Sequence, residues 1–418
     1  MYQRSEAHAI TATYEDVWLV SGARTPFANY AGVLRDVSPT DLGIHAARAV
    51  FERSQVAARD VDGVVAGNVA QSSFDAYYLP RHIGLYSGVS PEVPALLVQR
   101  LCGTGFETIL TAADHIKLGK AKLVLCVGTE SMSRNPVAAY SHRSGFRMGQ
   151  VEFGDFLWEA TLDTAANTRM GETAERLAKL YDIDRETVDR FAEESFSRAV
   201  AAWESGFFDD EVEAVSPQEW PLDGYQPRAI RLPRGIERFE RDDHVRPSPL
   251  EVLRKLRPAF GPEGVQTGGN SSAIVDGSAA ALVASGEYVR AHGLRPLARV
   301  VAGATVAVPP EIMGIGPAPA IRAVLKRTGL DPQRIDRFEI NEAFAAQYLA
   351  VEKELELDRQ KVNVRGGAIA IGHPLAATGV RLTVTAAREL QQTSGEFAIS
   401  SACIGGGQGI AILLQRTS

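Results

Sequence analysis

Cysteine is scarce in this chain: only Cys102, Cys126 and Cys403 occur among 418 residues. Three scattered cysteines do not make the paired framework of a small secreted domain, and none of their spacings matches a zinc site. This scarcity favours a reducing compartment, so we expect a cytoplasmic protein. It also gives no reason to expect a bound metal.

Long hydrophobic runs and an excess of positive charge are missing as well. The longest apolar runs, such as 123–127, are far shorter than the roughly 20 residues needed to cross a bilayer, so no membrane span is expected. The first sixteen residues lack an apolar segment and include Glu6, Glu15 and Asp16, which argues against a signal or transit peptide. The net charge of −7 argues against nucleic acid as the main partner.

An internal duplication organises the chain. Segments 46–62 and 320–336 align without gaps at an offset of 274, with six identical positions in seventeen. Each segment predicts a helix, a turn and a strand, and the two strands are expected at 61–65 and 335–340. Chance similarity between two such units is the alternative interpretation.

The correspondence continues downstream, where each copy is expected to run through a further strand, a turn of small residues, a helix and a strand. The first helix should reach Leu118 and the second about Gln391, with strands following at 122–127 and 397–400. Apolar strands that alternate with amphipathic helices indicate a sheet covered on both faces. We therefore predict an α/β fold made of two duplicated halves.

A different region separates the two halves. Residues 133–261 are rich in Arg, Phe, Trp and Gly, and they include a helical stretch at 171–204 and a proline-punctuated segment at 215–249. Long insertions in α/β enzymes commonly serve as lids or ligand-binding loops. We therefore divide the chain into an N-terminal half (1–132 with 262–288), a loop domain (133–261) and a C-terminal half (289–418).

Cys102 lies where an apolar strand meets a glycine-flanked turn that opens a helix. This position exposes a side chain, and the helix N-terminus favours the thiolate. A buried structural cysteine in a close-packed turn fits the local pattern equally well. His373 occupies the matching turn of the second copy, so the two helix starts are expected to converge and to make His373 a base for Cys102. By itself, this histidine could also be a helix-capping residue.

Two further segments carry polar or reactive groups. Cys403 ends a strand that runs into glycines, which let backbone N–H groups approach a ligand or a developing oxyanion. A phosphate cradle and a plain tight turn are the rival readings. Asn341 follows the strand at 335–340, where polar residues commonly face the ligand crevice, although it could also be an ordinary helix N-cap.

Taken together, these segments resemble the thiolase family in order and over almost the whole chain. The matching blocks are Cys102-Gly-Thr-Gly, Gly128-Thr-Glu-Ser-Met-Ser, Met170-Gly-Glu-Thr-Ala-Glu, Lys255-Leu-Arg-Pro-Ala-Phe, Thr267-Gly-Gly-Asn-Ser-Ser, Met313-Gly-Ile-Gly-Pro, Asn341-Glu-Ala-Phe-Ala, Gly372-His-Pro-Leu and Cys403-Ile-Gly-Gly-Gly-Gln-Gly. The resemblance implies a five-layer αβαβα fold with an inserted loop domain that binds coenzyme A and contributes to tetramerisation. It also implies a homodimer or homotetramer.

The resemblance also implies roles for individual residues. Cys102 looks like the nucleophile, His373 like its base and Cys403 like the second acid/base. Asn341 resembles the residue that positions a water, which with His373 forms one oxyanion hole, while the N–H groups of Cys102 and Gly405 form the other. The expected contacts to coenzyme A or the acyl group are Ser272, Arg246, Met170 and Phe344, although the spacing around Arg246 is one residue short.

The expected activity is reversible: a 3-oxoacyl-CoA and coenzyme A give an acyl-CoA and acetyl-CoA by a ping-pong route through acyl-Cys102. Coenzyme A and acyl-CoA enter as substrates, and no prosthetic group is implied. Arg169 stands where short-chain biosynthetic members carry His, and Ala376 replaces a glycine after His-Pro-Leu. An acetoacetyl-CoA-specific biosynthetic enzyme, a non-thiolytic condensing enzyme and an acyl-CoA carrier without turnover are the alternatives.

Overall fold

The computed structural model describes residues 8–71, 73–140 and 142–417. The first seven residues of the N-terminal segment considered above lie outside this description. Among the described residues, no helix is both long and apolar enough to cross a membrane.

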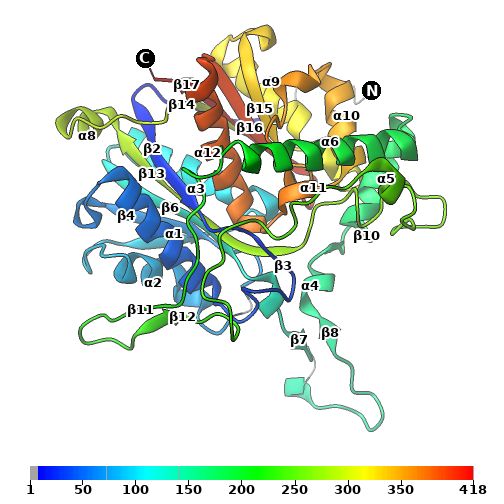
Figure 1. Cartoon of the computed structure of the whole chain (residues 1–418), viewed down its shortest axis with the longest axis horizontal. Coiled ribbons are helices and arrows are strands. Elements are labelled where there is room, and N and C mark those ends of the chain that lie inside the picture. The colour runs from blue at the N-terminus through cyan, green and yellow to red at the C-terminus, as the bar shows by residue number, and fades with distance from the viewer. Residues whose placement is uncertain (1–7, 72, 141, 418) are drawn as a thin grey trace.

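The strands of the two halves form two sheets that meet along a short junction (Figure 1). The N-terminal sheet has the order β2 (Val17–Arg24), β13 (Val275–Ser285), β6 (Leu123–Glu130), β4 (Gly63–Gly67) and β5 (Ala95–Val98), and β3 (Ala28–Asn29) pairs with β13. The C-terminal sheet has the order β15 (Ile335–Ile340), β16 (Phe397–Ile404), β17 (Gln408–Arg416) and β14 (Ala298–Ala307), and β1 (Ala9–Thr13) pairs with β14. The sheets join only where Leu19 and Trp18 of β2 pair with Ala298 and Arg299 of β14.

Helices fill the space between the sheets and cover their outer faces. The central layer is α3 (Thr104–Lys117) with α12 (Leu375–Thr393), and α12 contacts strands of both sheets. Outside the N-terminal sheet lie α1 (Pro39–Ser54) and α2 (Leu79–Tyr86), and outside the C-terminal sheet lie α9 (Pro317–Thr328) and α10 (Ala345–Leu355) (Figure 1). The short helix α8 (Gly286–Ala291) links β13 to β14. This arrangement confirms the predicted five-layer α/β fold.

The duplication extends to individual backbone contacts. Helices α1 and α9 end at residues with positive φ, Gln55 (56°) and Gly329 (67°), which occupy the same place in the repeat. The repeated Asp62 accepts hydrogen bonds from the N–H groups of Lys122 and Leu123, at 2.7 and 3.0 Å. Its counterpart Asp336 accepts from Glu396 and Phe397, at 2.6 and 3.1 Å. Each copy therefore uses one aspartate to fix the start of its next strand.

Two elements differ from the sequence-based expectation. The helical stretch at 171–204 is two helices, α5 (Met170–Leu180) and α6 (Arg185–Glu204), because the chain turns at Asp182, whose φ is 49°. The segment before His373 is the four-residue helix α11 (Ala368–Ile371) and not a strand. Its alternating Ala and Ile residues are all buried, so the segment lacks the alternation of buried and exposed positions that would distinguish a strand from a helix.

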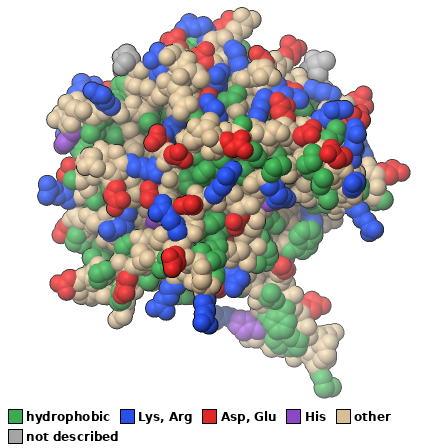
Figure 2. Space-filling view, in the orientation of Figure 1, with side chains coloured by type: hydrophobic (Ala, Val, Ile, Leu, Met, Phe, Trp, Pro, Cys, Tyr) green, Lys and Arg blue, Asp and Glu red, His purple; other side chains and the backbone are tan. Residues whose placement is uncertain are grey.

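The region between the halves wraps around both of them and also projects from the body. Its remaining elements are β7 (Val137–Ala138), β8 (Gly154–Asp155), α4 (Phe156–Glu159), β9 (Leu162–Asp163), β10 (Thr168–Arg169), β11 (Gln218–Trp220), β12 (Arg228–Ile230) and α7 (Leu250–Leu253). Strands β7 and β8 form an arm that extends away from the five layers (Figure 1). Figure 2 shows hydrophobic side chains gathered on this arm, which include Val137, Tyr140, Met148, Val151 and Phe153.

Candidate active site

The first turns of α3 and α12 lie against each other at the centre of the molecule. A Cβ atom added to Gly105 would lie 2.6 Å from the carbonyl oxygen of Ala376, and one added to Gly379 would lie 2.3 Å from the amide nitrogen of Phe106. Gly105 and Gly379 occupy equivalent places in the repeat. The two helix starts therefore converge as predicted, and the contact depends on glycine on both sides.

Cys102 lies in a short 3-10 turn, Leu101–Gly103, immediately before α3. Leu101 has a φ of 45°, a conformation that costs a bulky residue energy and that is concentrated at functional sites. Arg100 holds the turn in place by donating from Nε to Glu107, at 2.7 Å, and from Nη1 to Gln408, at 3.1 Å. The nucleophile turn is thereby tied both to its own helix and to the start of β17.

The environment of the Cys102 thiol opposes ionisation. Burial raises its pKa to about 11, although hydrogen bonds from the N–H groups of Gly405 and of Cys102 itself act in the opposite direction. Desolvation is thus the largest influence on the thiol pKa, and it acts against the thiolate that the helix N-terminus favours. A nearby base is needed to remove the proton.

His373 lines the same cavity as Cys102. Its Nδ1 lies 2.6 Å from the Thr378 hydroxyl, which itself donates to the carbonyl oxygen of Pro374 at 3.4 Å. We assign the proton to Nδ1, since the Thr378 oxygen then accepts it and Nε2 is left as the acceptor that faces the Asn341 amide. Burial, together with the positive charge of Arg381, lowers the pKa of His373 to about 3, so the imidazole is neutral.

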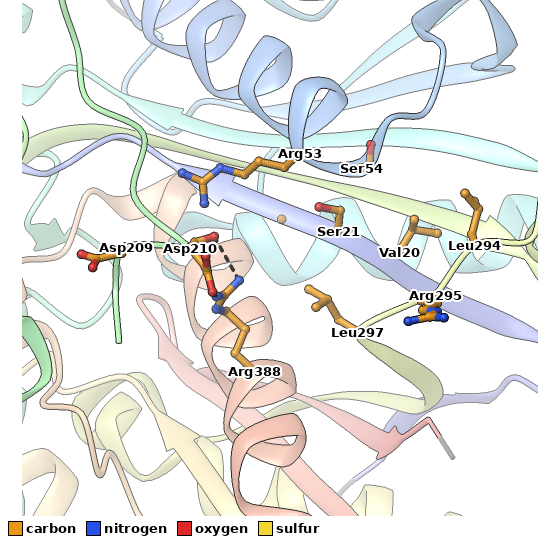
Figure 3. A pocket seen from close by; sticks show the side chains of 11 residues that line it. Val20, Ser21, Arg53, Ser54, Asp209, Asp210, Leu294, Arg295, Leu297 and Arg388 are labelled. Carbon is orange, nitrogen blue, oxygen red and sulfur yellow. Dashed lines mark hydrogen bonds and ion pairs between the residues drawn. The ribbon is translucent and has the colours of Figure 1, made fainter. Parts of the chain in front are cut away.

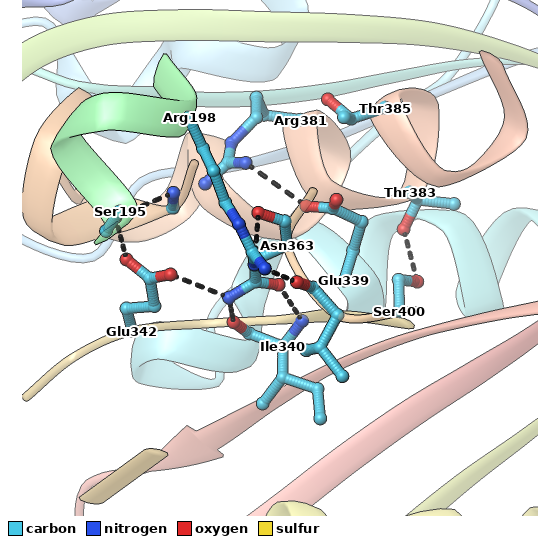
Figure 4. A network of polar contacts seen from close by, with 12 residues as sticks. Ser195, Arg198, Glu339, Ile340, Glu342, Asn363, Arg381, Thr383, Thr385 and Ser400 are labelled. Carbon is cyan, nitrogen blue, oxygen red and sulfur yellow. Dashed lines mark hydrogen bonds and ion pairs between the residues drawn. The ribbon is translucent and has the colours of Figure 1, made fainter. Parts of the chain in front are cut away.

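Arg381 belongs to a buried polar network that includes Glu339, Glu342 and Asn363 (Figure 4). Its Nη1 lies 3.5 Å from Glu339, and none of its three guanidinium nitrogens has a hydrogen-bond partner among the described residues. Burial raises the pKa of Glu339 to about 8, and the Arg381 charge acts against this shift. Glu339, Glu211 and Glu342 act on the charge of Arg381, and that charge in turn acts on His373.

Cys403 lies at the end of β16, where the chain turns through three glycines into β17. Gly406 and Gly407 have φ values of 80° and 81°, so this turn requires glycine. The Cys403 thiol is fully buried, and burial followed by the charge of Cys102 raises its pKa. The two sulfur atoms are therefore close enough for charge on one to affect the other.

Asn341 follows β15 and contacts His373. Its Nδ2 lies 3.4 Å from His373 Nε2, and its backbone N–H donates to Ser401 at 2.9 Å. The Oδ1 atom is buried and has no partner among the described residues, so it remains available to a water or a substrate group.

Glu130 is a site residue that the sequence reasoning did not single out. Its buried carboxylate accepts hydrogen bonds from the N–H groups of Val69, Ala70 and Ala376, at 3.1, 3.0 and 3.2 Å. The amide of Asn68 adds a further one, at 3.0 Å. Ala376 belongs to the first turn of α12, so one carboxylate joins the N-terminal half to the turn that carries His373.

A cavity of about 710 Å³ lies beside these residues, and its lining includes neither Asn341 nor Cys403, which are buried behind it. Cys102 and His373 both line it, and so do three of the four predicted contact residues, Ser272, Met170 and Phe344. Arg246 does not line the cavity but lies beside it, 3.1 Å from Nδ1 of the lining residue His244. Ala376 is buried outside the lining, so its methyl group does not narrow the cavity.

The cavity wall includes residues that the sequence reasoning left without a role. These are chiefly Tyr30, Met132, Leu157, Trp158, Thr161, Phe260, Ile274 and Met313. Three of them, Met132, Phe260 and Met313, fall inside blocks quoted above, which is the only signal that could have found them. Trp158 stacks with Arg169, whose guanidinium lies 4.1 Å from the ring centre. No cluster of metal-ligating side chains was found among the described residues.

Comparisons with known proteins agree with this site. The model "Thiolase, N-terminal domain" matches residues 17–287, and "Thiolase, C-terminal domain" matches residues 294–416. The 3-ketoacyl-CoA thiolase, mitochondrial, of Bos taurus is 44% identical over 97% of this chain and 100% of its own length. These matches identify an acyltransferase. The chain belongs to the thiolase family.

Solved structures extend the comparison. The human mitochondrial 3-ketoacyl-CoA thiolase in complex with CoA has a TM-score of 0.91 and 42% identity, covering 99% of this chain and 100% of that one. The Bacillus anthracis acetyl-CoA acetyltransferase has a TM-score of 0.89 and 38% identity, covering 97% and 100%.

The prediction of a cytoplasmic location is contradicted by these comparisons. The bovine and human relatives, which match this chain along nearly its full length, are mitochondrial thiolases. The scarce cysteines and the charged N-terminal residues are evidence about secretion, and they do not distinguish between intracellular compartments that keep thiols reduced.

Proposed function

We propose that this enzyme cleaves 3-oxoacyl-CoA with coenzyme A, in a reversible reaction that passes through an acyl thioester on Cys102. The observation that carries this proposal is the single cavity lined by Cys102 and by a neutral His373, with the Cys403 thiol buried next to Cys102. Relatives named 3-ketoacyl-CoA thiolase and a related structure that contains CoA support the substrate assignment.

The first half-reaction transfers an acyl group to the enzyme. His373 Nε2 takes the proton of the Cys102 thiol, and the sulfur attacks the C3 carbonyl of the substrate. The C2–C3 bond then breaks, and the Cys403 thiol donates its proton to C2 of the departing acetyl-CoA. The products are acetyl-CoA, acyl-Cys102, a protonated His373 and a Cys403 thiolate.

The second half-reaction restores the enzyme. The Cys403 thiolate takes the thiol proton of coenzyme A, whose sulfur attacks the acyl-Cys102 carbonyl. The Cys102 thiolate leaves and recovers its proton from His373. Each attack places negative charge on an oxygen, and the N–H groups of Cys102 and Gly405, which lie within hydrogen-bonding reach of the Cys102 thiol, would stabilise it at one step. A water held by Asn341, together with His373, would provide the donors at the other.

We assign the binding of the coenzyme A arm to the wall that contains Ser272 and Phe344, and the acyl group to the part near Met170. Arg246 is retained as the contact to the adenine end, since it lies at the cavity edge beside His244. With this assignment, residues 133–261 are the loop domain. Residues 1–132 and 262–288 make up the N-terminal half, and residues 289–418 make up the C-terminal half.

We further propose that the enzyme assembles as a homodimer or homotetramer. The arm formed by β7 and β8 carries exposed apolar side chains, and the edge strand β5 exposes Leu96. Exposed apolar surface of this kind is characteristic of protein interfaces. Light scattering coupled to gel filtration measures the mass directly, and a monomer at working concentration would contradict the proposal.

The acyl-enzyme provides a direct test. The protein is mixed with 3-oxohexanoyl-CoA without free coenzyme A, quenched in acid and examined by intact and peptide mass spectrometry. We expect a butyryl group on Cys102 and release of acetyl-CoA. The Cys102→Ala variant should carry no adduct, while Cys126→Ala, the matched control, should keep it. An adduct on another residue, or turnover by Cys102→Ala, would reject the mechanism.

A chain-length series distinguishes the remaining possibilities. Thiolysis rates are measured for acetoacetyl-CoA and for longer 3-oxoacyl-CoA substrates. Activity that increases with length supports the proposed 3-oxoacyl-CoA specificity, whereas a sharp preference for acetoacetyl-CoA indicates the biosynthetic type. Release of carbon dioxide from malonyl-CoA would instead identify a decarboxylating condensing enzyme.

A further inference from the structure

A second cavity, of about 640 Å³, lies near the far end of α12 from His373 (Figure 3). No residue of the proposed reaction lines it. Its walls come from five parts of the chain: Val20, Ser21 and Gly22 of β2, Arg53 and Ser54 at the end of α1, Asp209 and Asp210 of the inserted region, Leu294, Arg295 and Leu297 before β14, and Arg388 of α12.

The cavity exists because the two sheets separate after their short junction. Strand β2 pairs with β14 only at Trp18 and Leu19, and further along, the N–H of Arg24 donates to Glu211 of the inserted region. Between these points the edge of β2 is open. Backbone groups alternate along a strand, so the N–H of Gly22 points to the same side as that of Arg24 and faces the opening. The strand edge thus offers a hydrogen-bond donor to a ligand.

Three arginines from separate elements surround this opening. Arg295 is exposed and forms no hydrogen bond or ion pair with any residue that the structure describes. Arg388 donates a hydrogen bond from Nη1 to the backbone oxygen of Asp210, at 3.0 Å. Its Nη2 forms an ion pair with the Asp210 carboxylate, at 2.9 Å. Since the Asp210 side chain is 86% exposed, this pair is weak and a stronger anion can replace it.

The guanidinium groups of Arg388 and Arg53 are incompletely paired. Arg53 donates from Nη2 to the carbonyl oxygen of Val212 and to Glu213, at 2.7 and 3.1 Å. Its Nη1 and the Nε of Arg388 are buried and have no partner among the described residues. Buried donors without acceptors are unfavourable, so a rearrangement that supplies an oxyanion to these groups is stabilising.

We propose that this cavity binds a small molecule that carries a phosphate or carboxylate group. Arg388 and Arg53 hold the oxyanion, Arg295 supplies a further positive charge, and the body of the ligand packs on Val20 and Leu297. Arginine forks match both kinds of oxyanion, and the volume is that of an ordinary small-molecule site.

Calorimetric titration tests the proposal with three probes: inorganic phosphate, AMP and succinate. The full-length enzyme is titrated at constant ionic strength with saturating coenzyme A, so that the phosphate-binding groups of the active site are occupied. The variants are Arg295→Gln and Arg388→Gln, with Arg190→Gln as the matched control because Arg190 is an exposed arginine in an ordinary helix pair with Glu186. AMP and succinate separate phosphate-bearing from carboxylate-bearing ligands.

We expect saturable binding of at least one probe, about tenfold weaker in Arg295→Gln and Arg388→Gln and unchanged in Arg190→Gln. Arg295→Gln keeps the test valid if Arg388→Gln does not fold, since Arg295 has no structural partner. Equal binding by the wild type and both cavity variants, or no saturable binding of any probe, would overturn the proposal. Binding that is lost only in Arg246→Gln would place the anion at the active site and would overturn it too.

Discussion

Cys102 and His373 both lie in surroundings that oppose charge. Burial raises the pKa of the thiol to about 11 and lowers that of the imidazole to about 3, so the resting pair is neutral. Transfer of the proton from sulfur to nitrogen creates two charges in the cavity. The N–H groups of Cys102 and Gly405 and the amide of Asn341 are therefore needed mainly after the substrate has bound, when these charges form.

This neutral pair predicts the pH dependence of Cys102 alkylation. A thiol with a raised pKa gains thiolate progressively as the pH rises, so the iodoacetamide rate should increase about tenfold per pH unit up to about pH 10. A neutral His373 gives no inflection near its ordinary pKa. Peptide mass spectrometry measures the rate at Cys102, and a plateau from about pH 7 would instead reveal a thiolate–imidazolium pair in the free enzyme. Acyl-CoA should protect Cys102.

Glu130 gives a second prediction at the residue scale. In Glu130→Gln, the new amide N–H₂ would face N–H groups that now donate to the carboxylate, so the turn that carries His373 should move relative to Cys102. We expect kcat for thiolysis to fall by up to about a hundredfold while KM changes little. Glu287→Gln, an exposed carboxylate, is the control. A normal kcat in a folded Glu130→Gln protein would show that the contact does not position the base.

The sequence predicted the reactive residues more completely than the residues that hold them in position. Cys102 and His373 were identifiable because each lies in a turn with a recognisable pattern, and Cys403 because its strand runs into three glycines. Glu130 ends an apolar strand, and its importance arises only when Ala376, remote in the chain, folds against it. Glu130 lies inside the block Gly128-Thr-Glu-Ser-Met-Ser, but the block does not indicate which residue the carboxylate would contact after folding.

At the scale of elements, local pattern was reliable for three of the predicted strands. The strand predicted at 335–340 is β15 with the same bounds, and the strands predicted at 122–127 and 397–400 lie within β6 and β16, apart from the first residue, Lys122. The segment at 368–371 is buried on all sides and became a helix, because the turn before His373 is set by packing against the other half. The break between α5 and α6 depends on one backbone angle at Asp182.

The contact between α3 and α12 makes a prediction at this scale. Gly379→Ala would place a methyl group 2.3 Å from the Phe106 nitrogen, so the helices must separate. We expect a loss of about 1–3 kcal/mol in the free energy of unfolding and a larger fall in kcat, since both catalytic turns sit on this contact. Urea unfolding and thiolysis assays measure the two effects. Gly63→Ala has open space around the new methyl group and should change neither.

At the scale of the whole molecule, the inserted region holds the two halves together through buried charge. Arg24 of β2 donates to Glu211 at 2.6 Å and to Asp242 at 2.7 and 3.0 Å, and all three side chains are buried. Glu211 also accepts from Thr385 of α12, at 2.9 Å. The pKa of Arg24 is raised by both carboxylates against the effect of burial, so the guanidinium stays charged.

Substitution of Arg24, which does not line the cavity that contains Cys102, should therefore change the stability of the whole molecule. Arg24→Met leaves the carboxylates of Glu211 and Asp242 buried without their cation, which should cost about 3–5 kcal/mol of unfolding free energy. Limited proteolysis should then cut the inserted region first. Arg290→Met, which breaks only an exposed pair with Asp16, is the control. A loss no larger than that of Arg290→Met would show that the buried charge does not anchor the insertion.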